Sequence, residues 1–180
     1  QMVSGHRRKV AAELAGMDRI PCIVRDLTDD QATIVMVDSN LHREQILPSE
    51  KAFAYKMKLD AMKRQGFRSD LTSGPLGQKL SREVIAENSP DGARQIQRYI
   101  RLTNLVPELL ELVDNAVLEE PDKQRMALRP AVELSYLRKE EQLDLFDLIG
   151  EMDVTPSHAQ ALKLRRLSEG KGPGQRLARD

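Results

Sequence analysis

The stretch "ENSPDGARQIQRYIRL", residues 87–102, predicts a polar turn followed by an amphipathic helix. At about 100° per residue, Ile96, Tyr99 and Ile100 fall on one side of that helix. The other side carries Arg94, Arg98 and Arg101, and no acidic residue balances them. One face is therefore expected to meet a core, and the opposite face presents guanidinium groups.

The turn ahead of this helix offers several start signals. Ser89 before Pro90 gives a capping hydroxyl with proline in the first turn, and Asp91 or Gly92 can serve as the cap if the helix starts later. A further helix is predicted over residues 77–87. Two helices joined by so short a turn are typical of a helix-turn-helix DNA reader.

The polar side chains of this helix are suited to reading DNA. Arginine and glutamine can form two hydrogen bonds with guanine and adenine edges, which the start of a recognition helix reaches. We predict that the bases are contacted by Arg94, Gln95, Gln97 and Arg98. Phosphate contacts are predicted for Arg101 and for Lys79, which precedes the turn. The competing interpretation is a solvated basic face, which the lack of any balancing acid disfavours.

Composition favours a helical protein of ordinary size. The 180 residues are 40% hydrophobic and 31% charged, and only 3% are aromatic, so the core must be aliphatic. The single cysteine, Cys22, excludes an intrachain disulfide and a multi-cysteine zinc site. There is no long apolar run or signal-like segment, so we expect a cytoplasmic protein without a membrane partner.

The formal net charge of zero conceals a polarised distribution. Residues 56–82 carry seven basic and two acidic residues, and residues 93–102 carry three basic and none acidic. Residues 103–125 and 139–153 each carry six acidic residues, against two and one basic. Only the first two segments are candidates to face a polyanion; the acidic ones are solvated faces or partner surfaces.

Most of the chain has helix-like apolar spacing. The helix that carries the arginines is predicted over residues 90–105, and further helices are predicted over residues 7–15, 29–44, 49–65, 107–115, 130–137, 139–152 and 156–167. The polar stretch "FRSDLTSGPLG", residues 67–77, resembles a hinge. We therefore predict an amino-terminal domain over residues 1–66, a helical domain over 67–169 and a flexible tail over 170–180.

One strand is predicted, over "IPCIVRDL", residues 20–27. The run is rich in β-branched residues and has Pro21 near its start, where a strand tolerates proline. A lone strand leaves backbone groups unpaired. Either residues 34–37 are extended too, or the chain begins after the neighbouring strand, which is the expectation we favour.

Four short motifs follow one another in the amino-terminal half, namely "GHRR", "IPCIVRDL", "SNLHRE" and "LPSEKAFAY". They resemble the Gly-Glu-Arg-Arg box, Pro-Val-Ile-Val-like strand, Glu-Asn-Leu-Gln-Arg box and Leu-x-Pro-x-Glu-x-Ala segment of the ParB family of plasmid and chromosome partition proteins, which implies a nucleoid-associated protein. The second half is similar to the family's helix-turn-helix domain in "QIQRYIRLTNLVPELLELVD", "RPAVELSYL" and "TPSHAQALKLRRLS". The likeness covers about residues 3–168 and is nearest to ParB-like proteins of mobile elements.

The resemblance implies a mainly α fold, with a truncated small α/β amino-terminal domain before an all-helical helix-turn-helix domain. It implies a homodimer that binds a centromere-like site on double-stranded DNA, closes as a sliding clamp with CTP and magnesium, and stimulates a ParA-type ATPase. A glycine turn that brings backbone N–H groups and two guanidinium groups to a helix start suits phosphate. By matching position, the resemblance places Gly5, Arg7 and Arg8 at the CTP phosphates. From the second box it assigns Asn40 and Arg43 to the nucleotide site, with Asn40 also as the metal ligand.

The chain departs from the family at two positions. His6 replaces a glutamate of the first box, and Ser39 replaces the glutamate expected to help hold magnesium. Asp38 is a candidate substitute. The resemblance extends to CTP hydrolysis, and the loss of this glutamate weakens that expectation. The family's first strand with its arginine box and its carboxy-terminal dimerisation domain are missing, so we expect a fragment.

Three other functions compete with a partition role. Sulfiredoxins share the fold family but carry a reactive cysteine in the phosphate loop, whereas this loop has none and Cys22 is expected to pack in the strand. A ParB-like nuclease is disfavoured because no carboxylate cluster is evident, and surface positions are predicted for His6, His42 and His158. A helix-turn-helix transcription regulator of a mobile element, without nucleotide use, stays open.

Overall fold

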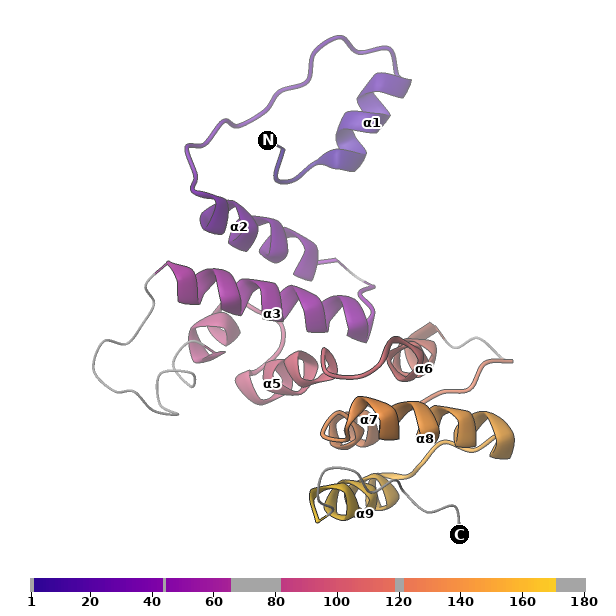
Figure 1. Cartoon of the computed structure of the whole chain (residues 1–180). Coiled ribbons are helices and arrows are strands. Elements are labelled where there is room, and N and C mark those ends of the chain that lie inside the picture. Colours follow the sequence, from indigo (N-terminus) through magenta and orange to yellow (C-terminus); the bar gives the residue numbers. More distant parts are fainter. Residues whose placement is uncertain (1, 44, 66–81, 119–121, 171–180) are drawn as a thin grey trace, which may run out of the picture. The chain divides into compact units, whose positions relative to one another are not determined.

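The structure is a computed structural model that describes residues 2–43, 45–65, 82–118 and 122–170. Within these ranges the chain consists of helices and connecting segments, without a β-strand (Figure 1). Residues 82–87 are helical. The labelled helices are α1 (His6–Leu14), α2 (Asp29–Leu41), α3 (Pro48–Arg64), α5 (Ala93–Leu102), α6 (Pro107–Leu118), α7 (Leu128–Leu134), α8 (Lys139–Met152) and α9 (His158–Glu169). The predicted mainly helical fold is confirmed.

The helices fall into two compact units. The first consists of Gln1–Glu44 and Met57–Pro90, and the second of Gln45–Lys56 and Asp91–Asp180. The division falls within α3, whose first half belongs to the second unit. The domain boundary predicted after residue 66 lies outside the described residues, as does nearly all of the predicted tail.

In the first unit, α2 starts with a capping box. The Thr28 hydroxyl accepts a hydrogen bond from the Gln31 N–H at 3.3 Å, and the Gln31 side chain accepts one from the Thr28 N–H at 3.0 Å. These bonds satisfy amide groups that have no partner inside the helix. Val37 and Leu41 of α2 are buried, as their helical spacing predicts. The alternative of an extended segment over residues 34–37 is wrong.

Two ion pairs join α2 to the second half of α3. Arg64 contacts Asp30 at 2.8 Å near the surface. Lys58 is only 4% exposed, and its ammonium group donates to the Asp38 carboxylate. A buried ammonium group without a counter-charge is costly, so this contact fixes α2 against α3.

In the second unit, α7 packs against α5, α6 and α9, and α6 also packs against α8. Their facing sides form one aliphatic core, in which each fully buried leucine contributes roughly 1.5–3 kcal/mol. Its wholly buried members include Leu102, Leu109, Leu134 and Ala161, with Tyr99 and Phe146 at the edge. This core supports α5 from one side.

The side chain of Gln142 on α8 is buried and fully hydrogen-bonded. Its oxygen accepts from the Val106 N–H at 2.8 Å, and its amide nitrogen donates to the carbonyls of Asn104 at 3.2 Å and Leu137 at 3.0 Å. One amide therefore connects the turn after α5, the end of the α7 region and the start of α8.

The predicted strand over residues 20–27 is not formed. This segment runs as a single connecting trace between α1 and α2 (Figure 1), with Ile23 83% and Val24 90% exposed. Cys22 is exposed as well, so its predicted packing role is wrong. A strand needs a hydrogen-bonding neighbour, and no other part of the described chain supplies one.

Candidate nucleic-acid interface and phosphate site

Helix α5 separates its apolar and basic faces as its sequence predicts. Ile96 and Leu102 are fully buried, and Tyr99 packs against the core. Arg94 and Gln97 on the opposite side are exposed. Neither has a hydrogen bond or ion pair to the rest of the described chain. Both side chains are therefore available to an external partner.

Gln95 and Arg98 are half-buried and contact each other. The Arg98 guanidinium donates to the Gln95 side-chain oxygen at 3.3 Å, across the three-residue spacing that aligns side chains on a helix. No carboxylate of the described residues pairs with Arg98, so the charge of the guanidinium is uncompensated. This arrangement orients both side chains without occupying all of their donors.

The start of α5 is anchored to the first half of α3. Gly92 is the N-cap residue and makes no side-chain cap bond, while Asp91 accepts hydrogen bonds from Lys51 at 2.9 Å and from the Tyr55 hydroxyl at 2.7 Å. Tyr55 also stacks on Tyr99 of α5, with 6.1 Å between ring centroids. Asp91 therefore serves this long-range anchor, a role that local sequence signals could not reveal.

The end of α5 is anchored by Arg101. Its guanidinium donates to the hydroxyl of Ser135 at 3.1 Å and to the carbonyl of Ser135 at 2.9 Å, and it lies 3.7 Å from the ring centre of Tyr136. The predicted phosphate contact at this position thus has internal partners. Lys79, the other residue nominated for phosphate, lies outside the described residues.

The first box forms the start of α1. Gly5 is the N-cap residue with φ of 95°, a left-handed conformation that residues with a side chain rarely adopt. Arg7 and Arg8 are exposed in the first turn, and the described residues place no carboxylate against either. Unpaired amide groups and two guanidinium groups at a helix start fit an anionic phosphate group.

The second box offers fewer ligands for a metal. Asn40 is half-buried and Arg43 is exposed, while the Ser39 hydroxyl donates to the Met36 carbonyl at 2.8 Å. The Asp38 carboxylate is engaged by Lys58 and so is a poor substitute for the family's glutamate. Asn40 alone leaves a donor set that does not fit magnesium, which prefers carboxylates together with phosphate oxygens.

The two boxes are not joined by direct contacts. No hydrogen bond or ion pair within the described chain links residues 5–8 to residues 38–43. His6, His42 and His158 are exposed. Among the described residues, no three His, Cys, Asp or Glu side chains are grouped to hold a metal ion, and no helix is long and apolar enough to span a membrane.

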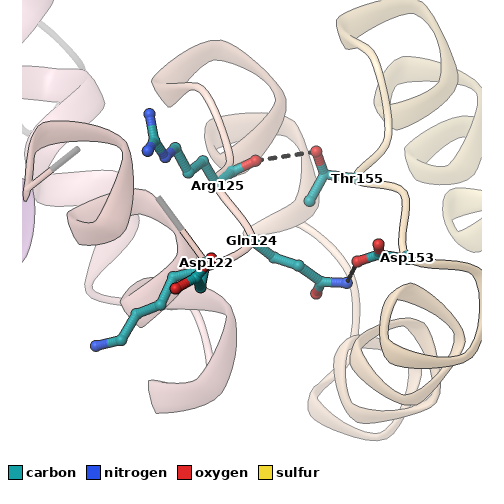
Figure 2. A pocket seen from close by; sticks show the side chains of 6 residues that line it. Asp122, Gln124, Arg125, Asp153 and Thr155 are labelled. Carbon is teal, nitrogen blue, oxygen red and sulfur yellow. Dashed lines mark hydrogen bonds between the residues drawn. The ribbon is translucent and has the colours of Figure 1, made fainter. Parts of the chain in front are cut away.

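A polar cavity of about 360 Å³ lies beside the end of α8 (Figure 2). Gln124 reaches across it to donate to Asp153 at 2.7 Å and to the Ile149 carbonyl at 3.2 Å. Thr155 donates to the Arg125 carbonyl at 3.0 Å. These bonds hold the connection before α7 against the end of α8, which gives the cavity walls a structural role that the sequence did not suggest.

Comparison with known proteins agrees with the arrangement of motifs. The pattern of the ParB N-terminal domain matches residues 1–41. The chain is 27% identical over 174 residues to a probable chromosome 1-partitioning protein ParB of Deinococcus radiodurans, covering 97% of this chain and 52% of that protein. It is 28% identical over 181 residues to a nucleoid occlusion protein of Geobacillus thermodenitrificans, covering 99% and 56% respectively.

A third relative has a higher identity over a shorter span. The chromosome-partitioning protein Spo0J of Thermus thermophilus is 31% identical over 114 residues, which is 63% of this chain and 36% of that protein. The chain spans about half the length of the first two relatives. The matches run through both units, so the chain is similar to ParB-type partition proteins over most of its length.

Proposed function

We propose that this chain is a sequence-specific DNA-binding protein of the partition type, with α5 as its recognition helix. The proposal rests on one observation, that α5 is held internally on one side and at both ends while its opposite side is available to a partner. Its apolar side and both of its ends are held by the second unit, while Arg94 and Gln97 have no internal partner among the described residues. A rigid helix with a free arginine and glutamine face is the arrangement that major-groove reading requires.

Electrostatics support the same role. Helix α5 carries three arginines and no acid, and along the sequence it follows a short turn after the helical residues 82–87, the order of elements in a helix-turn-helix motif. Neutralising DNA phosphates releases counterions and supplies affinity that does not depend on sequence. Base contacts by Arg94, Gln97 and Arg98 would then supply the preference for one site.

The experiment starts with selection of binding sites from DNA duplexes that have a randomised central segment. Replacing Arg98 by alanine should weaken binding to the selected duplex by about 1–3 kcal/mol and relax preference at one base pair. The matched control is Arg166→Ala, which removes an exposed arginine of α9 and should leave the preference unchanged. Selection of no duplex by the wild-type protein, or equal preference in Arg98→Ala and wild type, would refute the proposal.

We also propose that the first box binds the phosphates of CTP in the intact protein. Gly5, Arg7 and Arg8 support this, because the exposed helix start and its two guanidinium groups suit a polyphosphate. Arg7→Ala should weaken CTP binding about tenfold by removing one charge-assisted contact, measured by titration calorimetry against ATP, GTP and UTP with and without magnesium. Lys9→Ala is the control, because Lys9 already pairs with Glu13 at 3.4 Å. Equal binding of CTP to wild type and Arg7→Ala would contradict the proposal.

The proposed cellular role follows the names of the relatives. In its full form, the proposal describes a cytoplasmic homodimer that binds a centromere-like DNA site and stimulates a ParA-type ATPase. The same homodimer would slide along DNA as a CTP-dependent clamp. The second candidate is a DNA-binding regulator that uses no nucleotide. It is favoured by one observation, that the second box offers magnesium only Asn40 while Asp38 pairs with Lys58. Crosslinking of the intact protein across the genome distinguishes them, because sliding spreads the signal around one site and operator binding gives isolated peaks.

A further inference from the structure

The ring of Tyr136 lies between two guanidinium groups. The guanidinium carbon of Arg101 is 3.7 Å from the ring centre and that of Arg165 is 3.6 Å from it. Two such groups cannot share one face of a ring at these distances, so they stack on opposite faces. Arg101 belongs to α5 and Arg165 to α9, while Tyr136 follows α7, so one aromatic ring connects three elements of the second unit.

Arg101 is fixed by more than the ring. Its two hydrogen bonds end on Ser135, the C-cap residue of α7, which is 3% exposed. The Ser135 hydroxyl in turn donates to the Val132 carbonyl at 2.6 Å. A guanidinium group at the end of a helix satisfies carbonyl groups that lack partners within it. Moving Arg101 to a DNA phosphate would break these contacts.

The other cation of the stack is neutralised locally. Arg165 donates to Glu169 at 2.7 Å and to Glu133 at 3.0 Å, and both contacts raise the pKa of Arg165, the one with Glu169 more strongly. Repulsion between the two guanidinium groups is thereby offset by carboxylates on one side. No carboxylate among the described residues pairs with Arg101, which instead contacts the ring and the Ser135 oxygens.

We infer that Arg101, Tyr136 and Arg165 form a positioning stack that fixes the last turn of α5 through α7 and α9. The inference rests on the DNA-reading role proposed for α5 and assigns Arg101 to orientation of that helix. Arg94, Gln97 and Arg98 project from the helix that the stack holds. The geometry of base reading therefore depends on Arg165, which lies on a different helix.

The first test needs no DNA. Amide hydrogen exchange of residues 100–103 is compared in wild type, Tyr136→Ala and Tyr136→Phe. Loss of two cation–π contacts should speed exchange in Tyr136→Ala by about tenfold, while Tyr136→Phe keeps the ring and the wild-type rate. If circular dichroism shows that Tyr136→Ala does not fold, the exchange of residues 100–103 is measured in Arg165→Met instead. That variant removes one of the two stacked cations. Wild-type exchange in the folded alanine or methionine variant would overturn the inference.

The second test separates positioning from phosphate contact. Arg101→Ala should weaken binding to the duplex that wild type selects by about tenfold, with an unchanged salt dependence on unselected duplexes. A phosphate contact predicts a slope of log affinity against log salt that is smaller by about 0.9, and substantial rescue by Arg101→Lys. Either of those results would overturn the inference. Lysine should not rescue a positioning role, because one ammonium group cannot reproduce the stacked, two-bond geometry with Ser135.

The two tests fail in different ways. If wild type selects no duplex but the exchange rates change as expected, the recognition role of α5 is lost and the positioning stack stands. If wild type selects a duplex and Tyr136→Ala matches it in both preference and exchange, the stack is overturned and the recognition role stands.

Discussion

Replacement of Asp91 by alanine should destabilise the second unit by about 2–4 kcal/mol, a value between those of exposed and fully buried ion pairs. Asp91 accepts from Lys51 at 2.9 Å and from the Tyr55 hydroxyl at 2.7 Å. The side chains of Lys51 and Asp91 are only 21% and 15% exposed, and Tyr55 is wholly buried. Alanine would leave a half-buried ammonium group without a counter-charge and a buried hydroxyl without its acceptor.

The tyrosines provide a selective probe for this change. The chain has no tryptophan and three tyrosines, Tyr55, Tyr99 and Tyr136, all in the second unit. Urea unfolding followed by tyrosine emission therefore reports that unit, and circular dichroism follows the whole chain. Asp91→Asn should cost less, about 1–2 kcal/mol, because the amide oxygen can still accept from Tyr55.

A double-mutant cycle isolates the ion pair. Lys51→Met combined with Asp91→Ala should give a coupling free energy of about 1–2 kcal/mol, reduced but not abolished by salt because the pair is largely shielded. The control is Asp144→Ala, an exposed acid of α8, with an expected change within about 0.5 kcal/mol. A change in Asp91→Ala as small as that of the control, or a coupling of zero, would refute the anchoring role.

Two further substitutions test the internal contacts. Gln142→Ala leaves the buried Val106 N–H without an acceptor and should cost about 2–4 kcal/mol in urea unfolding followed by tyrosine emission. The control is Gln97→Ala, which removes an exposed glutamine side chain; an equal loss of stability in that variant would contradict the role given to Gln142. Asp38→Ala leaves the Lys58 ammonium group buried and unpaired and should cost about 3–5 kcal/mol by circular dichroism. Restored stability in Asp38→Ala with Lys58→Met would support this reason, and an unchanged midpoint in Asp38→Ala would contradict it.

Local signals predicted the helices well. The bounds of α8 agree with the predicted residues 139–152, because acidic residues in the first turn and a regular apolar spacing are local properties. The start of α9 moves to His158 because the Ser157 hydroxyl and Gln160 form a capping box that the prediction from residue 156 did not use. The capping options before α5 resolve to Gly92.

The features that could not be predicted from the sequence depend on contacts between residues far apart in the chain. Asp91 is a plausible helix cap in isolation, but its partner Lys51 lies 40 residues away. Arg101 belongs to the basic face in a helical projection, yet Ser135, 34 residues further along, accepts its hydrogen bonds. The strand over residues 20–27 fails for the same reason, since β-propensity describes a fit to a neighbouring strand. The four predicted base contacts and the nucleotide site stay predictions.

The two ends of α5 show why a helix with weak caps of its own can serve as a reader. Gly92 makes no side-chain cap bond, and the Thr103 hydroxyl donates only to the Ile100 carbonyl at 2.9 Å. With ten residues, α5 is too short for a stable isolated helix. Its order must therefore come from tertiary contacts, and these are made by Asp91 before its first turn and Arg101 in its last. Because both anchors leave the face of Arg94 and Gln97 untouched, substitutions on that face should alter DNA preference with little change in stability. Substitutions at either anchor should change both properties together, and this difference separates reading from positioning along a single helix.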